Sequence, residues 1–227
     1  MKHYLILVFA IVVVSNIFAA SEPKFFDTRW ISSKPEMLTY KSTSKQGDGL
    51  YQVSIAKSDS TIEIYMNIIT NGFTKTVSGT MTLEMVPLQS RGKIIVNGQI
   101  IMETECSYEK DKLHISTLMK PYNQTMKNDP SFSTLVVDFS QLPLIARTLS
   151  LNVGAKYTFQ SLNPQTNAIV PFTLKVLGEE KIKEMDCYKV ESNDFEGTSL
   201  FWIEKGSRHR VVRIEQPETN RVTELIQ

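Results

Sequence analysis

The strongest constraint on the fold is a regular alternation of apolar and polar residues with a period of two. In the stretch TIEIYMNIIT, residues 61–70, this alternation divides the side chains between two faces. The apolar face holds Ile62, Ile64, Met66 and Ile68, and the opposite face holds Glu63, Tyr65 and Asn67. Such a pattern is typical of a β-strand with one buried face. Asn71-Gly72 follows at once and predicts a hairpin, because both residues tolerate the positive φ of a tight turn.

The same pattern continues along the chain. The return segment, residues 73–86, places Met81, Leu83 and Met85 on one face, and Gly79 in its middle predicts a bulge or bend. Further turns are predicted at Asn97-Gly98 and at the charged residues 109–112. Later, residues 171–177 alternate again, with Phe172, Leu174 and Val176 on the apolar side. Together these segments predict a mainly β protein, an antiparallel meander of roughly ten strands by usual strand length.

One segment has the period of a helix instead. In residues 138–151, the apolar side chains fall at positions i, i+3, i+4 and i+7. These are Leu142, Ile145, Ala146 and Leu149. Ser140 is a candidate N-cap, and Pro143 lies in the first turn, where a missing amide is tolerated. We therefore expect one short helix near residues 140–150, placed to cover an open end or face of the curved sheet.

The N-terminus has the layout of a secretory signal peptide. Lys2 precedes an apolar run from Leu5 to Val14, and small residues follow at Ala19, Ala20 and Ser21. The run is shorter than the roughly 20 apolar residues that span a bilayer. We expect residues 1–21 to be removed and residues 22–227 to form a single β-rich domain. The mature chain, without a transmembrane span, is then periplasmic or extracellular.

Charge and composition exclude several classes of partner. Without Lys2, the 25 basic residues become 24, which equals the 24 acidic residues. A balanced charge gives no reason to expect nucleic-acid binding, since that affinity comes mainly from neutralising phosphates. It also gives little reason to expect attraction to an anionic membrane surface.

The stretch from residue 186 to 216 carries the residues that could be mistaken for a reactive site. Its pattern places Tyr188 and Val190 on one face of a strand, with Cys187 on the other. We expect a solvated basic turn around His209, followed by a strand with Val212 and Ile214 on one face. We therefore expect these residues to have a structural role rather than to form a reactive site.

A resemblance to a known family is carried by the C-terminal half of the chain. Its specific residues are Gly178-Glu179, Cys187-Tyr188-Lys189-Val190, Trp202 and Arg213. In these residues the chain resembles an uncharacterised family of exported bacterial proteins with a domain of unknown function. Members of that family are similar to the open β-barrels of the periplasmic lipoprotein carriers, the LolA-like fold. The order of elements agrees from residue 36 to 227, and specific residues from about 139. The segment Lys183–Asp186 departs from the family pattern. The resemblance implies an open barrel and an exported location. It does not indicate any particular activity.

Catalytic chemistry is not indicated, and we expect the protein not to be an enzyme. The mature chain has two histidines, His114 and His209, and neither has a partner at metal-ligand spacing, so we expect no metal and no cofactor. Cys187 and His209 could form a nucleophile and base, but no third orienting group is evident. Glu179 and Glu180 point to opposite faces of a strand and cannot act together.

Two functions remain open. The first is a binding module for a lipid, a lipidated peptide or another apolar small molecule, held on the concave face of the sheet. The candidate ligand-binding residues are Ile64, Met66, Ile68, Met81, Leu83 and Met85. Methionine adapts to irregular apolar shapes, although the same side chains could equally fill a packed core. The second is an envelope interaction protein that binds a protein partner through a sheet edge or surface.

The two cysteines of the mature chain also leave two alternatives. Cys106 and Cys187 could form one disulfide in an oxidising compartment. Alternatively, both could be buried free thiols that pack as small apolar residues.

Overall fold

The chain folds into one long curved sheet. The computed structural model describes residues 26–45, 47–132, 136–163, 166–194 and 197–226, and these contain a 15-stranded sheet that does not close on itself. The first eight strands are β1 (Glu36–Ser44), β2 (Gly47–Lys57), β3 (Thr61–Thr70), β4 (Phe73–Thr82), β5 (Pro87–Val96), β6 (Gln99–Tyr108), β7 (Leu113–Met119) and β8 (Gln124–Asn128). The others are β9 (Val136–Val137), β10 (Lys156–Asn163), β11 (Ala168–Ile182), β12 (Met185–Asp194), β13 (Gly197–Glu204), β14 (Val211–Gln216) and β15 (Arg221–Leu225).

The order of strands divides the sheet into two halves. It runs from β8 back to β1, then from β15 back to β9, so that the first and last strands pair in the middle. All neighbours are antiparallel except β9 and β10, which are parallel. The expected mainly β, curved antiparallel sheet is confirmed. The expected number of strands was too low, because short and fully exposed strands such as β8 carry no alternation of apolar residues.

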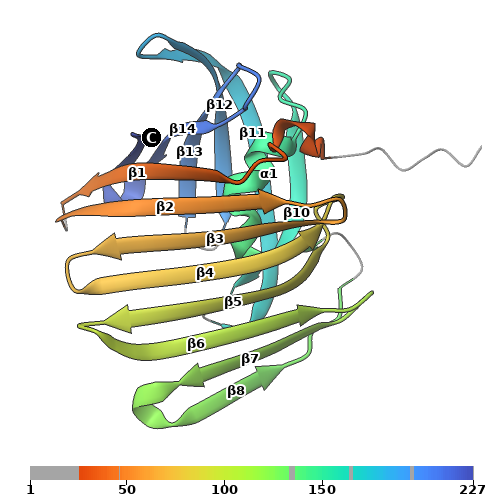
Figure 1. The fold of residues 1–227 in the computed structure, drawn as a ribbon, viewed down its shortest axis with the longest axis vertical. Helices are drawn as coiled ribbons and strands as arrows, with labels where there is room; N and C mark the ends of the chain where they lie inside the picture. The colour runs from red at the N-terminus through yellow and green to blue at the C-terminus, as the bar shows by residue number, and fades with distance from the viewer. Residues whose placement is uncertain (1–25, 46, 133–135, 164–165, 195–196, 227) are drawn as a thin grey trace, which may run out of the picture.

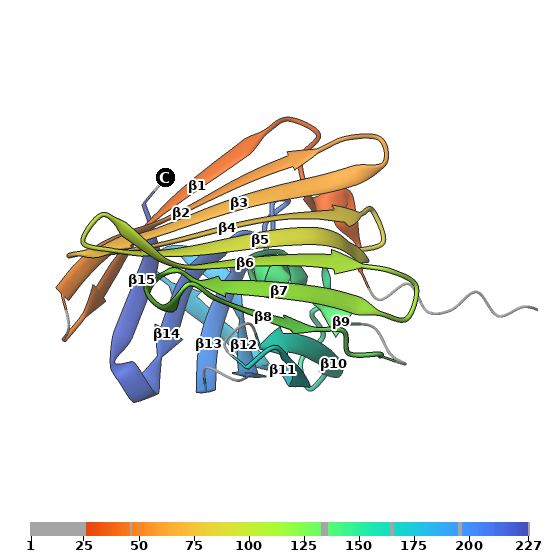
Figure 2. The ribbon, with the colours of Figure 1, turned by 90° about the horizontal axis from the view of Figure 1, so that it is seen from below.

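The two halves form two layers with the helix between them. Figure 1 shows β1–β8 lying across the view, with β10–β14 running steeply behind them. Figure 2, seen from below, places β1–β8 above the second half and the helix α1 (Leu142–Thr148) between the two layers. The main hydrophobic core joins side chains from both layers and from α1, among them Ile64, Leu144 and Phe172.

The helix confirms its sequence prediction, but its start is built differently. A short 3-10 helix, η3 (Phe139–Gln141), precedes α1, and its N-cap is Asp138 rather than the predicted Ser140. The Asp138 carboxylate accepts a hydrogen bond from the Ser140 backbone amide, and the Gln141 side-chain oxygen accepts one from the Asp138 backbone amide. This is a capping box, which satisfies backbone groups at the start of the turn.

The predicted turns at Asn71-Gly72 and Asn97-Gly98 are confirmed as the β3–β4 and β5–β6 hairpins. The predicted bulge or bend lies beside Gly79 rather than at it, because the register between β4 and β5 shifts between Thr80 and Met81. Gly79 pairs regularly with Ile64 and Ser90. A Cβ atom there would lie 2.2 Å from the Ser140 side-chain oxygen. The glycine is needed because η3 packs directly on this point of the sheet.

Another bulge lies in the second half of the sheet. The register between β13 and β14 shifts between Trp202 and Ile203, so that Trp202 is opposite Arg213 and Ile203 is opposite Val211. As a result, Val212 joins a small cluster with Cys187 and Trp202, whereas Ile214 packs against the main core. The prediction that Val212 and Ile214 share a face was therefore wrong, because a bulge adds one residue and reverses the alternation.

The predicted signal peptide, residues 1–21, lies outside the described residues. Within the described part of the chain, no helix has the length and apolar character that crossing a membrane requires.

Candidate functional site

Most of the predicted ligand-binding residues lie in the packed core. Ile64, Met66, Met81 and Met85 do face the interior, as predicted, but each is at most 5% exposed. Leu83 is partly buried against the same core, just beyond the end of β4. Ile68 is also on the inner face, and it is only half-buried. The sequence therefore identified the correct face of β3 and β4, and the structure shows that most of this face is filled.

The segment from Asp138 to Thr148 covers this part of the inner face. Gln141 donates a hydrogen bond from Nε2 to the backbone oxygen of Met85 at 2.7 Å, and the same atom lies 3.5 Å from the Met81 sulfur. Gln141 is only 1% exposed, so these contacts hold the start of the segment inside the sheet. We call residues 138–148 the cover segment.

A buried carboxylate fixes the first end of the cover segment. Asp138 is 1% exposed, and it accepts hydrogen bonds from the Ser90 hydroxyl at 2.7 Å and from the Tyr108 hydroxyl. Burial, followed by the charge of Asp138, raises the pKa of Tyr108 well above its ordinary value. Burial likewise raises the pKa of the nearby Cys106 to about 12. Both groups therefore stay protonated, and the cluster is suited to holding the segment rather than to nucleophilic chemistry.

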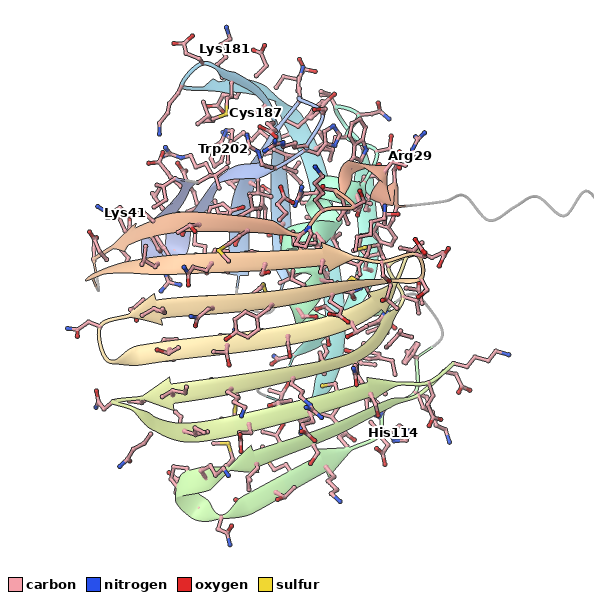
Figure 3. All side chains as sticks on the ribbon, viewed as in Figure 1. Arg29, Lys41, His114, Lys181, Cys187 and Trp202 are labelled. Carbon is pink, nitrogen blue, oxygen red and sulfur yellow. The ribbon has the colours of Figure 1, made fainter. Side chains whose placement is uncertain are left out.

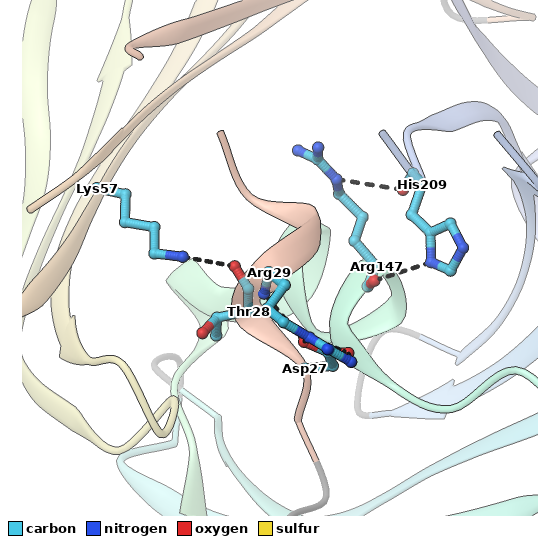
Figure 4. A network of polar contacts seen from close by, with 6 residues as sticks. All are labelled: Asp27, Thr28, Arg29, Lys57, Arg147 and His209. Atoms are coloured by element: carbon cyan, nitrogen blue, oxygen red, sulfur yellow. Dashed lines mark hydrogen bonds and ion pairs between the residues drawn. The ribbon is translucent and has the colours of Figure 1, made fainter. Parts of the chain in front are cut away.

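A buried arginine fixes the other end. Arg147 is 1% exposed and donates to the backbone oxygens of His209 (3.2 Å) and Arg208 (2.9 Å) and to the Glu36 carboxylate (2.9 Å). Figure 4 shows Arg147 reaching the His209 turn beside η1 (Thr28–Trp30), where Lys57 binds the backbone oxygen of Thr28.

His209 is not the solvated surface residue that the sequence predicted. It is 8% exposed, and its ring stacks on Trp30 with centroids 3.9 Å apart. Burial lowers its pKa below the ordinary value. The basic composition of the turn suggested solvent exposure, and the aromatic partner is too distant in sequence to have been anticipated.

Beyond the cover segment, the inner face of the first half is only half-buried. The residues concerned form one row of directly opposed positions across six strands, from β2 to β7. This row, which we call the rim row, consists of Tyr51, Ile68, Lys75, Ile94, Met102 and Met119. All six have intermediate exposure. They lie toward the β3–β4 and β5–β6 hairpins, at the left of the sheet in Figure 1.

The rim row differs from the core in its packing. Of its members, Tyr51 packs against the core, and its hydroxyl lies 3.2 Å from the Met66 sulfur. Ile68, Ile94, Met102 and Met119 are not among the residues that pack against the described core. An inward-facing set of apolar side chains that solvent reaches is a candidate ligand surface. Sequence reasoning found Ile68 but missed the others, although the alternation within 99–108 and 113–119 could have indicated Met102 and Met119.

A polar seam joins the open edge at β8 to the turn between β10 and β11 in the second half of the sheet. Asn128, at the end of the edge strand β8, donates a hydrogen bond to the backbone oxygen of Asn167, which precedes β11. Thr117 on β7 donates to the Asn167 side chain at 3.1 Å. Asn167 is 4% exposed. The barrel is therefore held at this seam by side-chain hydrogen bonds in place of a strand ladder.

A shallow groove of about 320 Å³ lies on the outer face of β2–β5. Its lining includes the small residues Ala56 and Ser78 and the large residues Tyr65 and Arg91. Arg91 is already paired with Glu105 at 3.4 Å. The groove is open, and its lining combines polar and apolar surface.

The two cysteines are free thiols, which is the second of the predicted alternatives. Cys106 lies in the main core, and Cys187 lies in a separate cluster with Trp202. Figure 3 labels Cys187 and Trp202 close to each other. Burial raises the pKa of Cys187, whose sulfur lies 3.5 Å from the backbone oxygen of Met185. His209 contacts Trp30 and Arg147. Cys187 and His209 therefore have different partners, and the hypothetical nucleophile–base pair is not assembled.

Comparison with known proteins places the chain in a family. Residues 37–223 match the family described as "Protein of unknown function (DUF3108)". A beta-barrel-like protein of the domain of unknown function DUF1849 from Brucella abortus has the same fold, with a TM-score of 0.59 and 10% identity over 85% of this chain and 96% of that chain. A DUF1329 family protein from Desulfovibrio piger aligns over 87% of this chain and 85% of its own at 9% identity, with a TM-score of only 0.27. No curated protein is significantly similar in sequence. The expected resemblance to an uncharacterised open-barrel family is confirmed.

Proposed function

We propose that this chain, which belongs to the DUF3108 family, is an exported, non-catalytic binding module that holds an apolar ligand on the inner face of its open barrel. The ligand is a lipid, a lipidated peptide or another apolar small molecule. The observation that carries this proposal is the half-exposed rim row, where Ile68, Ile94 and Met102 face inward without joining the core. Two of the six rim residues are methionines, whose flexible thioethers adapt to irregular ligands.

The contrast between the two faces of one strand provides the test. Ile68 and Ile69 are neighbours on β3, and Ile69 lies on the outer face with 38% exposure. A variant with Ile68→Lys and Met102→Lys places charges on the inner face. The control variant, Ile69→Lys with Ile100→Lys, places them on the outer face, where Ile100 is also 38% exposed.

An environment-sensitive apolar fluorescent probe should bind the wild type saturably. The inner-face variant should bind it on the order of tenfold or more weakly, because a charge on an apolar ligand wall costs several kcal/mol to desolvate. The outer-face control should bind as the wild type does. Equal binding by both folded variants would eliminate the rim row as the ligand surface. Met66 and Met81 are unsuitable for this test, since charges in the packed core would unfold the protein.

Export is the second element of the proposal, supported by the layout of residues 1–21. Protein recovered from the envelope or medium should begin at Glu22 when its N-terminus is sequenced. An N-terminus at Met1 would contradict cleavage.

A second function is favoured by the edge strand β8. All five of its residues are exposed, and one side of the strand has no neighbour in the described sheet. Such an edge can pair with a strand of a partner protein. Hydrogen exchange with and without an envelope extract separates the two functions. Protection of β8 would support the partner, whereas protection along the rim strands would support the apolar ligand.

A further inference from the structure

The turns that join β3 to β4 and β5 to β6 lie side by side at one end of the sheet, at the left of Figure 1. β4 and β5 remain paired up to these turns, and the Asn97 amide donates a hydrogen bond to the Gly72 backbone oxygen at 2.8 Å. The two hairpin ends therefore form one unit. We call residues 68–74 and 94–102 the tip.

The tip contains no charged residue. Its two segments read IITNGFT and IIVNGQIIM, and nine of these sixteen residues are apolar. The three turns at the opposite end of the same strands all carry charge, at Asp59, at Glu84 and throughout residues 109–112. The apolar character therefore belongs to one end of the sheet and is not a general property of its turns.

Both faces of the tip are apolar and accessible. On the outer face, Ile69 and Ile100 are each 38% exposed, and Ile95, which pairs with Ile100, is half-buried. On the inner face, Ile68 and Ile94 of the rim row are half-buried. A strand that packs on a core needs one apolar face, with polar residues on the other. Packing within the barrel therefore does not explain the outer apolar residues.

The two-sided exposure indicates what kind of partner covers the tip. Exposed apolar surface marks a site for a protein or for a membrane. A folded protein that packs on a sheet covers one of its faces. The interface of a lipid bilayer surrounds an inserted hairpin and contacts both faces at once, so a bilayer fits this surface better.

The backbone of the tip is suited to a medium with little water. Thr70 pairs with Phe73 and Val96 pairs with Gln99, so both strand ladders continue to the turns. Unpaired backbone groups are the main cost of placing a chain in lipid, and these ladders leave few of them. The two Asn-Gly turns have to enter with the apolar side chains, and the hydrogen bond between the turns reduces what they lose.

The size of the tip matches shallow insertion. Ile69 lies three residues from Gly72, which is about 10 Å at roughly 3.3 Å per residue. Interfacial segments reach about 5–10 Å into a bilayer. At the same end of the sheet, η2 (Lys120–Tyr122) joins β7 to β8, and Tyr122 is 75% exposed. Tyrosine is enriched at the membrane–water interface, where its ring contacts the apolar layer and its hydroxyl stays hydrated.

We propose that the tip docks the protein on the surface of a lipid bilayer, with both faces of residues 68–74 and 94–102 entering the interface. The interaction is apolar, so neutral lipids suffice, in agreement with the balanced charge of the chain. This inference does not rest on the proposed function. The two are connected in space, because the inner face of the tip is part of the rim row, and a docked protein presents that row to the bilayer.

Cosedimentation with phosphatidylcholine vesicles tests the docking. The chain used begins at Glu22, because the apolar run in residues 5–14 would bind lipid by itself. The wild type should bind the vesicles, and raising the salt from about 0.1 M to about 0.5 M should not weaken binding, since salt screens only attraction between charges. Ile69→Lys with Ile100→Lys should bind about tenfold more weakly, because charges are costly to place in an apolar layer.

The matched control adds the same two charges at the opposite end of the sheet. Met37, at the start of β1, is 67% exposed, and Val86, in the turn between β4 and β5, is 44% exposed. Met37→Lys with Val86→Lys should bind vesicles as the wild type does. A second measurement locates the contact. Phe73→Trp places a fluorophore in the tip, and vesicles of brominated phosphatidylcholine should quench it more strongly than they quench the tryptophans of the wild type.

The outcomes distinguish this inference from the proposed function. The variant with Ile69→Lys and Ile100→Lys should lose vesicle binding and keep binding of the apolar probe, which would support docking and show that the variant is folded. A wild type that does not bind vesicles, equal losses in the tip variant and the matched control, or no additional quenching in Phe73→Trp would each overturn the docking. A wild type that forms a dimer, converted to a monomer by the tip variant, would show that a second copy covers the tip instead.

Discussion

The two ends of the inner face of β2–β7 differ although they belong to the same strands. At one end, Ile64 and Met81 are at most 2% exposed beneath the cover segment. At the other end, Ile68 and Met102 have the same apolar chemistry and the same face, and they remain half-exposed. The alternation of the strand decides which face a residue occupies. The cover segment, which comes from a distant part of the chain, decides whether that face becomes core or surface.

The largest effect is expected where the cover segment is clamped. Arg147→Met removes the partner of Glu36 and takes this donor away from the backbone oxygens of His209 and Arg208. Breaking a buried ion pair from one side typically costs about 3–5 kcal/mol of unfolding free energy. Urea denaturation of the variant measures this loss. A cost below about 1 kcal/mol would show that the segment does not depend on this clamp.

A matched pair of methionines compares the two ends directly. Met81 is fully buried at the covered end, and Met102 is half-buried in the rim row. Met81→Ala should lose about 2–5 kcal/mol of unfolding free energy, the usual cost of a large-to-small change in a core. Met102→Ala should lose less than about 1 kcal/mol, as expected at a site outside the core. Similar losses, measured in the same denaturation experiment, would mean that the rim row is structural.

The close approach of η3 to the sheet can be tested at Gly79. Gly79→Ala places a methyl group against the Ser140 hydroxyl and should cost about 1–3 kcal/mol, the usual penalty of overpacking. The double variant Gly79→Ala with Ser140→Gly removes the clashing side chain. It should recover part of the loss, and the interaction energy follows from the double-mutant cycle. Additive losses would contradict direct contact between the two residues.

The smallest expected effect is a dependence on pH at the clamp. Burial lowers the pKa of His209 in the folded protein, so the unfolded chain binds this proton more readily. His209 therefore makes the protein less stable as the pH falls below about 6.5, the ordinary histidine value. The raised pKa of the exposed His114 acts in the opposite direction. The unfolding free energy lost between pH 7 and pH 5 should therefore be smaller for His209→Gln than for the wild type. His114 is present in both proteins and contributes equally to each.

Local features of the fold could be predicted from the sequence. Asn71-Gly72 and Asn97-Gly98 specify their hairpins by turn chemistry alone, and the apolar stripe of Leu142, Ile145 and Leu149 specifies a helix by spacing. Val212 was assigned to the wrong face because a bulge depends on how two strands pair. The sequence of either strand alone does not indicate it.

The candidate site was predicted only in part, for a physical reason. The inner face of β3 and β4 follows from alternation, but the accessible end of that face depends on where residues 138–148 pack. The packing of Gly79 and the burial of His209 were missed for the same reason, since their partners, Ser140 and Trp30, are distant in the chain. Contacts of this kind are fixed by the tertiary structure and have no local sequence pattern.

The pairing of β1 with β15 determines when folding can be completed. Tyr40 and Leu225 are directly opposite each other in the middle of the sheet. Apart from the parallel pair β9 and β10, each half is a succession of local hairpins, but the ladder between the halves needs the last strand. Contacts so distant in sequence form slowly and expose strand edges until they close. A chain that ended just before residue 221 would therefore carry two meanders with bare edges at the centre of the molecule, and it would be a substrate for chaperones.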